Sequence, residues 1–419
     1  MGVNLNKPFF LLAILILSSC FNLSFINCHI NDNQLGKNSE MFSQIIGPKS
    51  SSLSNPIHID NNWTEAKVAG LCSGLGTYSN PYIIKDLIIN SQSAKEGILI
   101  ENSNAYCVIE NCTIFVYGGH FPTGIKINNT SNAKIINNNC SLNYYGLYLD
   151  HSNNNTLIKN DVSDRFALSI PDALLLSNGI ILEDSNHNLI SKNFGKYGEH
   201  SAIYILESSH NIIINNEFYL FGTGLVLWGG TYNNISKNSF TNCHEDGLDL
   251  DGNDNNISEN VMKYNGESGV IIIGNDNFIT ENVMSNNGKS GIDLFFSDGN
   301  FITKNTVNYN NASGIDLSHS SHNTVSQNVI KSNKEYGIYL TQQSNYNVIS
   351  ENHLSGNKIC IKESDCWGNT ITNNGFCDPH GVLIMNVIFY CVLSLAIITL
   401  AIIAIMILVK LHRRKTYES

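Results

Sequence analysis

The sequence predicts an all-β chain, a right-handed parallel β-helix of about twelve coils, with an N-terminal signal segment and a C-terminal transmembrane helix. The first observation is a short phrase that recurs between Gly97 and Asn374, most clearly in GIDLFFSDGNFITKN and GIDLSHSSHNTVSQN, which begin at Gly291 and Gly314. The second is that the apolar runs in each phrase are short and have a period of two, which is typical of strands. So short a unit cannot bury its own apolar face, so successive units must stack on one another.

The spacing of the phrase gives the size of one coil. Phrases open at Gly97, Gly124, Gly146, Gly179, Ala202, Gly224, Gly247, Gly269, Gly291, Gly314 and Gly337, with steps of 22 or 23 residues from Gly179 onward. An asparagine closes each phrase in the same step, from Asn111 and Asn138 through to Asn374. Like positions of adjacent coils should then lie ~4.8 Å apart, and the usual chirality of parallel crossovers favours a right-handed coil.

The pleat assigns a role to each residue of the phrase. In GIDL we expect Ile292 and Leu294 to point into the core and Asp293 to point outward. The opening glycine fits a turn that needs a positive φ. The asparagines fit turn chemistry, because Asn tolerates the left-handed conformation, and stacked asparagines can also bond to one another as a ladder.

These repeats resemble the parallel β-helix proteins of the pectate-lyase-like superfold, and are close to the right-handed β-helix proteins of the NosD type. The resemblance covers about Tyr82 to Phe376. It implies the fold strongly and the activity weakly, because this fold hosts lyases, hydrolases, adhesins and binding proteins.

The segments before the repeats read as export and capping elements. Residues 1–28 resemble a secretory signal, with Lys7 ahead of an apolar run, and Leu17–Cys20 resembles a lipoprotein box whose Cys20 would be lipidated. Residues 29–55 are polar and predict a flexible leader. Residues 56–96 predict an N-terminal cap, because a solenoid must cover its first coil. The β-helix itself is expected over residues 97–380, with inserts at 115–122 and 161–178.

The C-terminal end is expected to anchor the chain. Residues 382–409 are almost entirely aliphatic and long enough to cross the ~30 Å hydrocarbon core as a helix. Four basic residues follow, so we expect residues 410–419 to be a cytoplasmic tail and the β-helix to lie outside. Cys360, Cys366 and Cys377 close the repeats, and a disulfide among them suits an exported chain.

Charge argues against one class of partner. The chain has 24 Lys and Arg and 35 Asp and Glu. Leaving out Lys7, the four tail bases and Glu418 gives 19 basic against 34 acidic residues, a balance of −15 for the exported part. We therefore expect no nucleic-acid partner, and favour neutral glycans or cations.

The outward positions of the glycine-led strands should form one continuous strip. Its carboxylates and aromatic residues are the candidate site residues: Asp249, Asp251, Asp293 and Asp316, with Tyr148, Tyr204, Trp228, Phe295 and Tyr339. Planar aromatic rings offer apolar faces to sugars, and carboxylates accept hydrogen bonds from hydroxyls. The leading hypothesis is thus a membrane-anchored, non-catalytic glycan-binding or adhesive protein, and a merely solvated polar face is the plain alternative.

Three further readings stay open. The first is a polysaccharide-degrading enzyme, a lyase or a glycoside hydrolase, with Asp249, Asp251, Asp293 and Asp316 as candidate catalytic residues. Asp293 and Asp316 should lie on adjacent coils, about 5 Å apart at the backbone, and paired carboxylates serve glycoside hydrolysis. Asp249, Asp251 and Asp293 offer the hard oxygen ligands that calcium prefers. The NosD resemblance implies a metal-associated accessory role, to which His187 and His210, in one turn position of adjacent coils, add little. The resemblance to pectate-lyase-like enzymes counts against catalysis. Those enzymes use an arginine as the base, and Arg165, within an insert, is the only arginine of this sequence outside the C-terminal tail.

Overall fold

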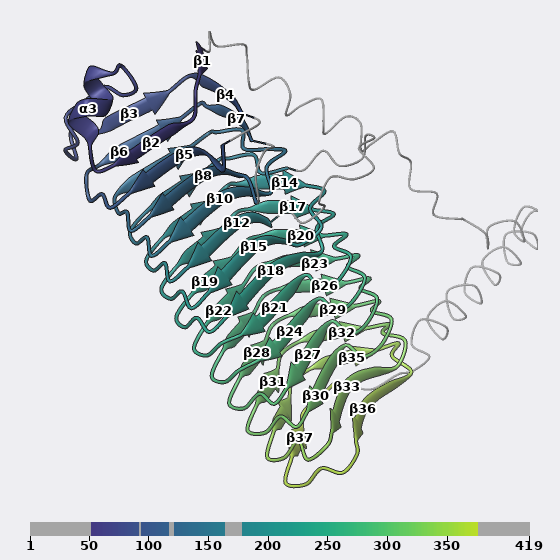
Figure 1. The fold of residues 1–419 in the computed structure, drawn as a ribbon. Coiled ribbons are helices and arrows are strands. Elements are labelled where there is room, and N and C mark those ends of the chain that lie inside the picture. Colours follow the sequence, from purple (N-terminus) through teal and green to yellow (C-terminus); the bar gives the residue numbers. More distant parts are fainter. Residues whose placement is uncertain (1–51, 92–93, 117–120, 164–177, 376–419) are drawn as a thin grey trace, which may run out of the picture. The chain divides into compact units, whose positions relative to one another are not determined.

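The structure is a computed structural model that describes residues 52–91, 94–116, 121–163 and 178–375. The chain divides into two units, Met1–Ser50 and Ser51–Ser419, and all described residues belong to the second. These residues form a parallel β-solenoid of stacked coils (Figure 1). The prediction of an all-β solenoid of about twelve coils is confirmed, since each of its two long sheets contains 13 strands.

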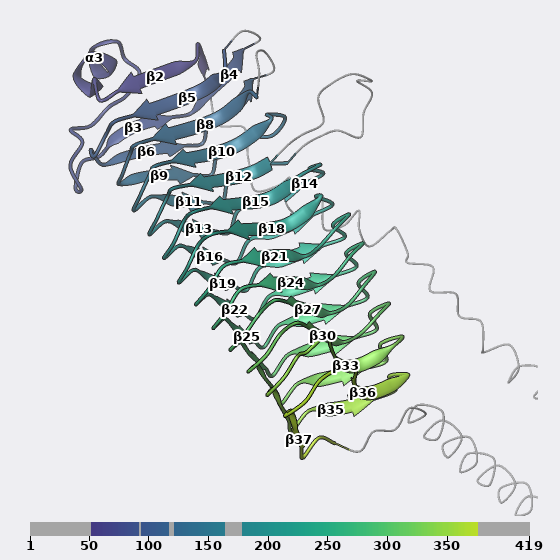
Figure 2. The same cartoon turned by 60° about the horizontal axis from the view of Figure 1, so that its bottom comes forward.

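Three sheets run along the solenoid, and each coil contributes one strand to each of the long ones (Figures 1 and 2). Sheet B consists of β2 (Ile57–Asp60), β5 (Glu96–Glu101), β8 (Thr123–Asn128), β10 (Tyr145–Asp150), β12 (Asn178–Glu183), β15 (Ser201–Leu206), β18 (Thr223–Trp228), β21 (Leu248–Asp251), β24 (Val270–Ile273), β27 (Ile292–Phe295), β30 (Ile315–Ser318), β33 (Tyr336–Thr341) and β36 (Ile359–Glu363). Sheet C consists of β3 (Tyr82–Lys85), β6 (Cys107–Glu110), β9 (Ala133–Ile136), β11 (Thr156–Ile158), β13 (Leu189–Ser191), β16 (Ile212–Ile214), β19 (Asn234–Ser236), β22 (Asn256–Ser258), β25 (Phe278–Thr280), β28 (Phe301–Thr303), β31 (Thr324–Ser326), β34 (Val348–Ser350) and β37 (Thr370–Thr372).

Sheet A runs along the third side in two parts. Its first part consists of β1 (Ser52–Ser54), β4 (Leu87–Ser91) and β7 (Thr113–Val116), and its second of β14 (Phe194–Lys196), β17 (Glu217–Tyr219), β20 (Ser239–Thr241), β23 (Val261–Lys263), β26 (Val283–Ser285), β29 (Thr306–Asn308), β32 (Val329–Lys331) and β35 (His353–Ser355). Neighbouring strands pair in parallel and in the register of the repeat, as in the pairing of Asp293 with Asp316. The coil stacking that the sequence predicts is therefore present.

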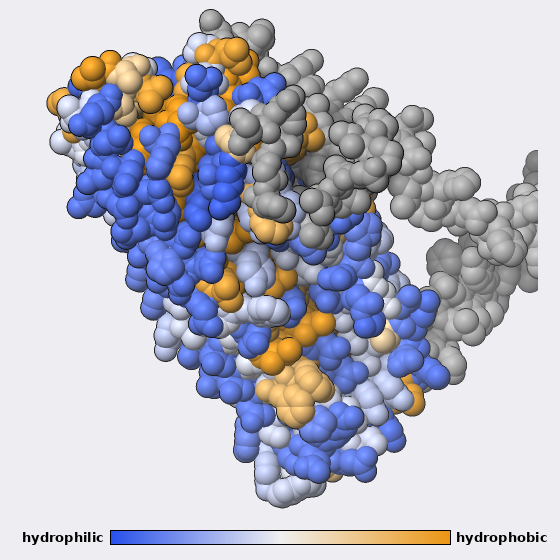
Figure 3. All heavy atoms as spheres, viewed as in Figure 1, coloured by the Kyte–Doolittle hydropathy of each residue, from blue (hydrophilic) through white to orange (hydrophobic). Residues whose placement is uncertain are grey.

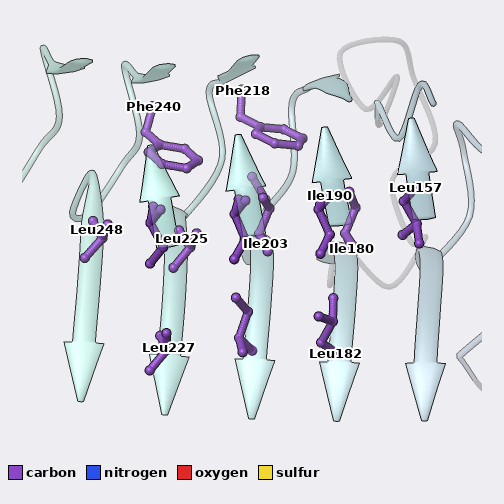
Figure 4. Close-up of a cluster of buried hydrophobic side chains, with 14 of the residues drawn as sticks. Leu157, Ile180, Leu182, Ile190, Ile203, Phe218, Leu225, Leu227, Phe240 and Leu248 are labelled. Carbon is purple, nitrogen blue, oxygen red and sulfur yellow. The ribbon is translucent and has the colours of Figure 1, made fainter. Parts of the chain in front are cut away.

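The core is a column of aliphatic residues with aromatic residues in its middle coils. Figure 4 shows this packing, with Ile203 and Leu225 of sheet B beside Phe218 and Phe240 of sheet A. The Phe218 and Phe240 rings stack with their centroids 6.2 Å apart and are fully buried. Ile292 and Leu294 are buried in the same way while Asp293 faces outward, as the period-two pattern predicts.

The glycines that open the phrases have a different role from the predicted one. Gly146 does not have a positive φ. A Cβ atom on Gly146 would lie 2.6 Å from the carbonyl oxygen of Gly179 and from a methyl of Val162. Close packing of coil on coil, rather than turn conformation, therefore requires glycine at this point.

The asparagines form the predicted ladders, but they do so inside the solenoid and without left-handed backbone. The backbone N–H and Nδ2 of Asn216 both donate to Oδ1 of Asn238, at 2.9 Å each, and Nδ2 also donates to the carbonyl of Ile190. The left-handed residue is the one before, Asn215, with φ 58°. Each buried amide is thus hydrogen-bonded, which removes the usual cost of burying a polar group.

The assignment of Asn111 to this ladder is wrong by one residue. The residue that donates its backbone N–H to Asn138, at 3.0 Å, is Cys112. Asn111 has a φ of 54° and its side chain bonds to Asn137, one position outside the ladder. At the N-terminal end of the ladder, the buried cysteine Cys112 therefore occupies the position that asparagine has in the later coils. The spacing of the asparagines alone does not reveal this.

Residues 56–96, predicted as a cap, contain both coil and covering elements. Strand β2 already pairs with β5, and the helix α3 (Trp63–Val68) follows it at the same end of the solenoid (Figure 2). The Trp63 ring stacks on Tyr82 with centroids 4.6 Å apart, and its Nε1 donates to Ser103 at 2.8 Å. This buried tryptophan joins the helix to the first coils.

Several predicted segments fall outside the described residues: the signal segment 1–28, nearly all of the leader 29–55, residues 164–177 of the second insert, the anchor 382–409 and the tail 410–419. Among the residues that the structure describes, no helix has the length and hydropathy needed to cross a membrane. Cys360 is disulfide-bonded, and Cys366 is a free thiol.

Candidate functional site

All of the candidate site residues lie on the outer face of sheet B. Two columns of outward side chains run along it. The first contains Lys126, Tyr148, Ile181, Tyr204, Val226, Asp249, Ile271, Asp293, Asp316 and Tyr339, each in register with the next. The second contains Asn128, Asp150, Glu183, Leu206, Trp228, Asp251 and Ile273, and further along it Phe295 and Ser318. The strip predicted from the sequence is therefore a real surface, with one ~4.8 Å step per coil.

Two aromatic groups stand out from this face. Trp228 is 49% exposed, meets Tyr204 edge-on with centroids 6.2 Å apart, and is in register with Asp251. Three coils further on, Phe295 and Phe296 are 42% and 57% exposed. Ile273, the last residue of β24 in the neighbouring coil, is also exposed at 38%. Figure 3 shows a hydrophobic area on this face of the molecule. Each group offers a ring face to a ligand that lies on the sheet.

The second aromatic group is larger than the sequence pattern indicates. Phe296 packs edge-on against Phe295 and stacks on His319, with a centroid distance of 4.6 Å to the histidine. Phe296 and His319 both have a φ of 50° and follow the end of a strand. The period-two pattern stops at that corner, so it misses them. Their equal place after successive GIDL strands was the available signal.

Three carboxylates of this face, Asp249, Asp293 and Asp316, are partly buried and have raised pKa values. Burial, followed by the neighbouring charge of Asp293, raises the pKa of Asp316 to about 7. Burial also raises the pKa of Asp293, against the effect of Lys289, and that of Asp249, with Asp251 adding to it. Asp246, at the edge of β21, has a pKa raised to about 7, mainly by burial. These groups favour the neutral form more than an exposed aspartate does.

Few hydrogen-bond donors offset the effect of burial on the pKa values of these side chains. Within the described part of the chain, the carboxylates of Asp249, Asp251 and Asp293 accept no hydrogen bond and join no ion pair. Asp316 accepts only a long bond of 3.4 Å from the hydroxyl of Ser313. The nearby ammonium of Lys289 pairs with Glu267 instead. We call this part of the face, from β18 to β33, the central region.

The same face carries a second group of carboxylates, from β5 to β12, which we call the N-terminal region. Here the ammonium of Lys126 lies 2.9 Å from Asp150 and 4.3 Å from the ring centroid of Tyr148. His151 bonds to Asp150 at 2.6 Å, and the hydroxyl of Tyr148 donates to Glu183. Every one of these carboxylates therefore has a donor from the protein.

The pKa values of the N-terminal region shift accordingly. The pKa of Asp150 is lowered: burial acts to raise it, but the hydrogen bonds from His151 and Lys126 outweigh burial. Hydrogen bonds from Asn128 and His58 lower the pKa of Glu101. Sequence reasoning singled out only Tyr148 here. The opposite charges of Lys126 and Asp150, on adjacent coils of the repeat, were the signal in the sequence for the other residues of this region.

The calcium hypothesis meets a geometric difficulty. Asp249 and Asp293 are separated by a whole coil, because Ile271 lies between them in the register. Two coil steps amount to ~9.6 Å at the backbone, whereas calcium binds its oxygens at ~2.3–2.6 Å. In the described ranges no three His, Cys, Asp or Glu side chains gather as a metal site requires.

The histidine pair is stacked rather than convergent. His187 and His210 share a turn position, as predicted, and their rings lie parallel with centroids 4.8 Å apart. Tyr232 continues the stack at 5.2 Å from His210. The three rings belong to successive corners with positive φ. This arrangement indicates a corner stack that covers the edge of the coils.

Comparison with known proteins identifies the fold. The family model described as the right-handed beta helix region matches residues 73–234, 172–276 and 223–376, which together span 73–376. No curated protein matches the sequence.

Among solved structures, the chain is similar to a variant of the periplasmic alginate epimerase AlgG, with 13% identity, a TM-score of 0.45, and coverage of 78% of this chain and 84% of that one. The A-module of a mannuronan C-5 epimerase from Azotobacter vinelandii gives 13% identity, a TM-score of 0.42, and coverage of 79% and 97%. The Dettilon tailspike protein gives 14% identity, a TM-score of 0.43, and coverage of 70% and 62%. Similarity at this level concerns the fold alone.

Proposed function

This chain belongs to the right-handed β-helix family, and from that premise we propose that it is a carbohydrate-binding protein whose binding surface is the central region of sheet B. The fold by itself does not select this function. The surface chemistry does: rigid strands present ring faces and unpaired oxygen acceptors in a fixed register.

One observation carries the proposal. Trp228 and Phe295 are exposed on the same face as Asp249 and Asp293, two partly buried carboxylates that accept no hydrogen bond from the described residues. A buried acceptor without a donor is unfavourable, and the hydroxyl groups of a sugar would supply the missing hydrogen bonds. The aromatic faces would bury the apolar faces of the sugar rings at the same time.

The test is direct binding to the purified full-length chain. Calorimetric titration against a panel of neutral, acidic and amino-sugar oligosaccharides should give measurable affinity for at least one class. Trp228→Ala should weaken that binding about thirtyfold, which corresponds to roughly 2 kcal/mol for an exposed aromatic anchor. Tyr264→Ala, at a similarly exposed ring just after β23 of sheet A, is the matched control and should leave it unchanged. Equal losses in both variants would contradict the proposal.

A second function, cleavage of a polysaccharide, is favoured by the pair Asp293 and Asp316. The two residues are register partners on adjacent coils, so their backbones lie about 5 Å apart, near the separation of carboxylates in retaining glycosidases. With its pKa near 7, Asp316 would serve as the acid that protonates the leaving oxygen, and Asp293 as the nucleophile. Release of reducing ends that Asp316→Asn abolishes, with binding retained, would establish this function.

The location of the protein rests on the sequence. We propose that residues 382–409 anchor the chain in a membrane and place the β-helix outside, where polysaccharides occur. When cells that express the protein are fractionated, the full chain should be found in the membrane fraction. A chain that ends at residue 380 should be found in the soluble fraction. A full-length chain that is soluble without detergent would contradict the anchor.

A further inference from the structure

We infer that the preferred ligand of the central region is a positively charged glycan, namely a chain of amino sugars with free amines. This inference rests on the proposed function and specifies the substrate class of the same surface. Two independent properties of the surface point to it, the unpaired carboxylates and the exposed rings beside them.

The first property is the missing positive charge. In the N-terminal region, Lys126 and His151 neutralise Asp150 from within the protein. In the central region, no cation of the described residues hydrogen-bonds or ion-pairs with Asp249, Asp251 or Asp293. The nearby Lys289 is ion-paired with Glu267 and acts on Asp293 only through its charge. Asp249 and Asp293 are partly buried, whereas Asp251 is exposed. Charges held in a partly buried site are screened less than surface charges. A cationic ligand would therefore gain more here than on the rest of this acidic chain.

The second property is the position of the aromatic rings. Trp228 is in register with Asp251 of the next coil, so a cation that binds across these two coils would meet an indole and a carboxylate side by side. Phe295 lies in the coil of Asp293, and Phe296 and His319 extend the aromatic surface beside it. Aromatic faces attract cations through the ring quadrupole, most strongly when the cation is desolvated. Ring and carboxylate thus favour the same kind of ligand.

The surface also disfavours the opposite class. A uronic-acid chain would bring carboxylates onto Asp249, Asp293 and Asp316, and like charges at short range raise each other's pKa or repel. A neutral glycan can satisfy the acceptors with hydroxyls but leaves the charges unpaired. The expected order of affinity is therefore amino sugar first, neutral sugar second and uronic acid last.

Binding of a positively charged glycan should be coupled to the release of protons, which binding of a neutral glycan would not cause. Burial keeps Asp316 and Asp246 partly protonated near neutral pH. A bound ammonium stabilises the charged form of a neighbouring carboxylate, so binding should release protons to the buffer. Titrations in two buffers with different enthalpies of ionisation measure that release.

The test uses two hexamers that share one backbone, a glucosamine hexamer with free amines and its fully N-acetylated counterpart, at about pH 6 with the full-length chain. The charged hexamer should bind at least tenfold more tightly, release protons, and lose affinity when salt is added. The double variant Asp249→Asn/Asp293→Asn should abolish the preference. Asp254→Asn/Asp276→Asn, which removes two carboxylates from the adjoining corners, is the matched control and should retain it.

The outcomes separate the two proposals. If the N-acetylated hexamer binds as tightly as the charged one, the inference fails while carbohydrate binding stands. If a uronate hexamer alone binds, the inference fails in the same way. If the charged hexamer binds equally to both double variants, the attraction comes from the net charge of the chain and the inference is again wrong. Binding of no oligosaccharide overturns the proposed function as well.

Discussion

The N-terminal and central regions of sheet B use the same residue types on the same backbone and differ in whether their carboxylates have partners. Asp150 is held by Lys126 and His151, and its pKa is lowered. Asp293, in the same sheet, has no hydrogen-bond donor among the described residues, and its pKa is raised. The solenoid supplies rigidity to both regions equally. The difference shows that the protein's own donors satisfy the carboxylates of the first region, whereas Asp249 and Asp293 of the second accept no hydrogen bond from the described residues.

The two regions should respond to pH in opposite directions, and this is the largest effect we expect. Asp316 has a folded pKa near 7, above the ordinary value of about 3.9, so the folded state holds its proton longer. Its stabilising contribution is full at acid pH and falls as pH rises toward 7, by up to about 1.4 kcal/mol per pH unit. Glu101 and Asp150 have lowered pKa values, so their contribution is present above about pH 4 and is lost on acidification.

Backbone hydrogen exchange, corrected for the intrinsic rate, measures this contrast coil by coil. Protection around β27 and β30 should decrease between about pH 5 and pH 7, while protection around β8 and β10 should not. The variant Asp316→Asn should flatten the central response. Parallel pH profiles in the two regions would show that the pairing of carboxylates is not what distinguishes them.

Removal of Lys126 should have the next largest effect. Lys126→Met leaves Asp150 partly buried with one donor fewer and removes the cation over Tyr148, so we expect a loss of about 2 kcal/mol in the free energy of unfolding. Urea denaturation followed by circular dichroism gives the shift in midpoint. Lys237→Met, in an exposed pair with Glu259, is the control and should change stability by less than about 0.5 kcal/mol. Similar shifts for both would mean that the Lys126 network is not structural.

The mirror-image change in the central region should be stabilising. Asp293→Asn removes a partly buried charge that lacks donors, so we expect a gain of about 1 kcal/mol near neutral pH, with weaker binding of ligand. The same urea titration detects it. A destabilised Asp293→Asn protein would indicate that this carboxylate has a structural partner, against the interpretation given above.

The smallest effect concerns Lys289, whose ammonium lies close enough to lower the pKa of Asp293. Lys289→Gln should raise the pKa of Asp293 further and leave that of Asp150 unchanged, because the charge acts over a short range. Carboxyl carbon NMR of the two residues makes the comparison. A shift at Asp150 of the same size would mean that the two regions are coupled through the sheet.

The sequence predicted the fold and the composition of the face because both follow from periodicity. A step of 22 or 23 residues with period-two strands places Asp293 beside Asp316, and the register confirms it. The role of Gly146 was not predictable in the same way, since its reason is contact with Gly179 and Val162 across coils. The shift from Asn111 to Cys112 in the ladder is likewise hidden, because a thiol occupies the place of an amide.

The hydrogen-bond and ion-pair partners of the site residues are harder to predict from the sequence than the fold. Whether a carboxylate is paired depends on side-chain reach across coils, as between Lys126 and Asp150, and on residues at corners, such as His151 and His319. Those corner residues have left-handed backbone and fall outside the strand pattern. The aromatic and acidic strip was therefore visible in the sequence, whereas its division into a paired and an unpaired half was not.

The most direct test of the account is an NMR titration of the full-length chain labelled at the carboxyl carbons of Asp and Glu, with and without the glucosamine hexamer. We predict that the signals of Asp249, Asp293 and Asp316 titrate above the ordinary range of aspartate and move when the hexamer binds. Those of Glu101 and Asp150 should titrate below the ordinary range of their residue types and stay in place. Ligand-induced shifts at Glu101 and Asp150 with none in the central region would contradict it.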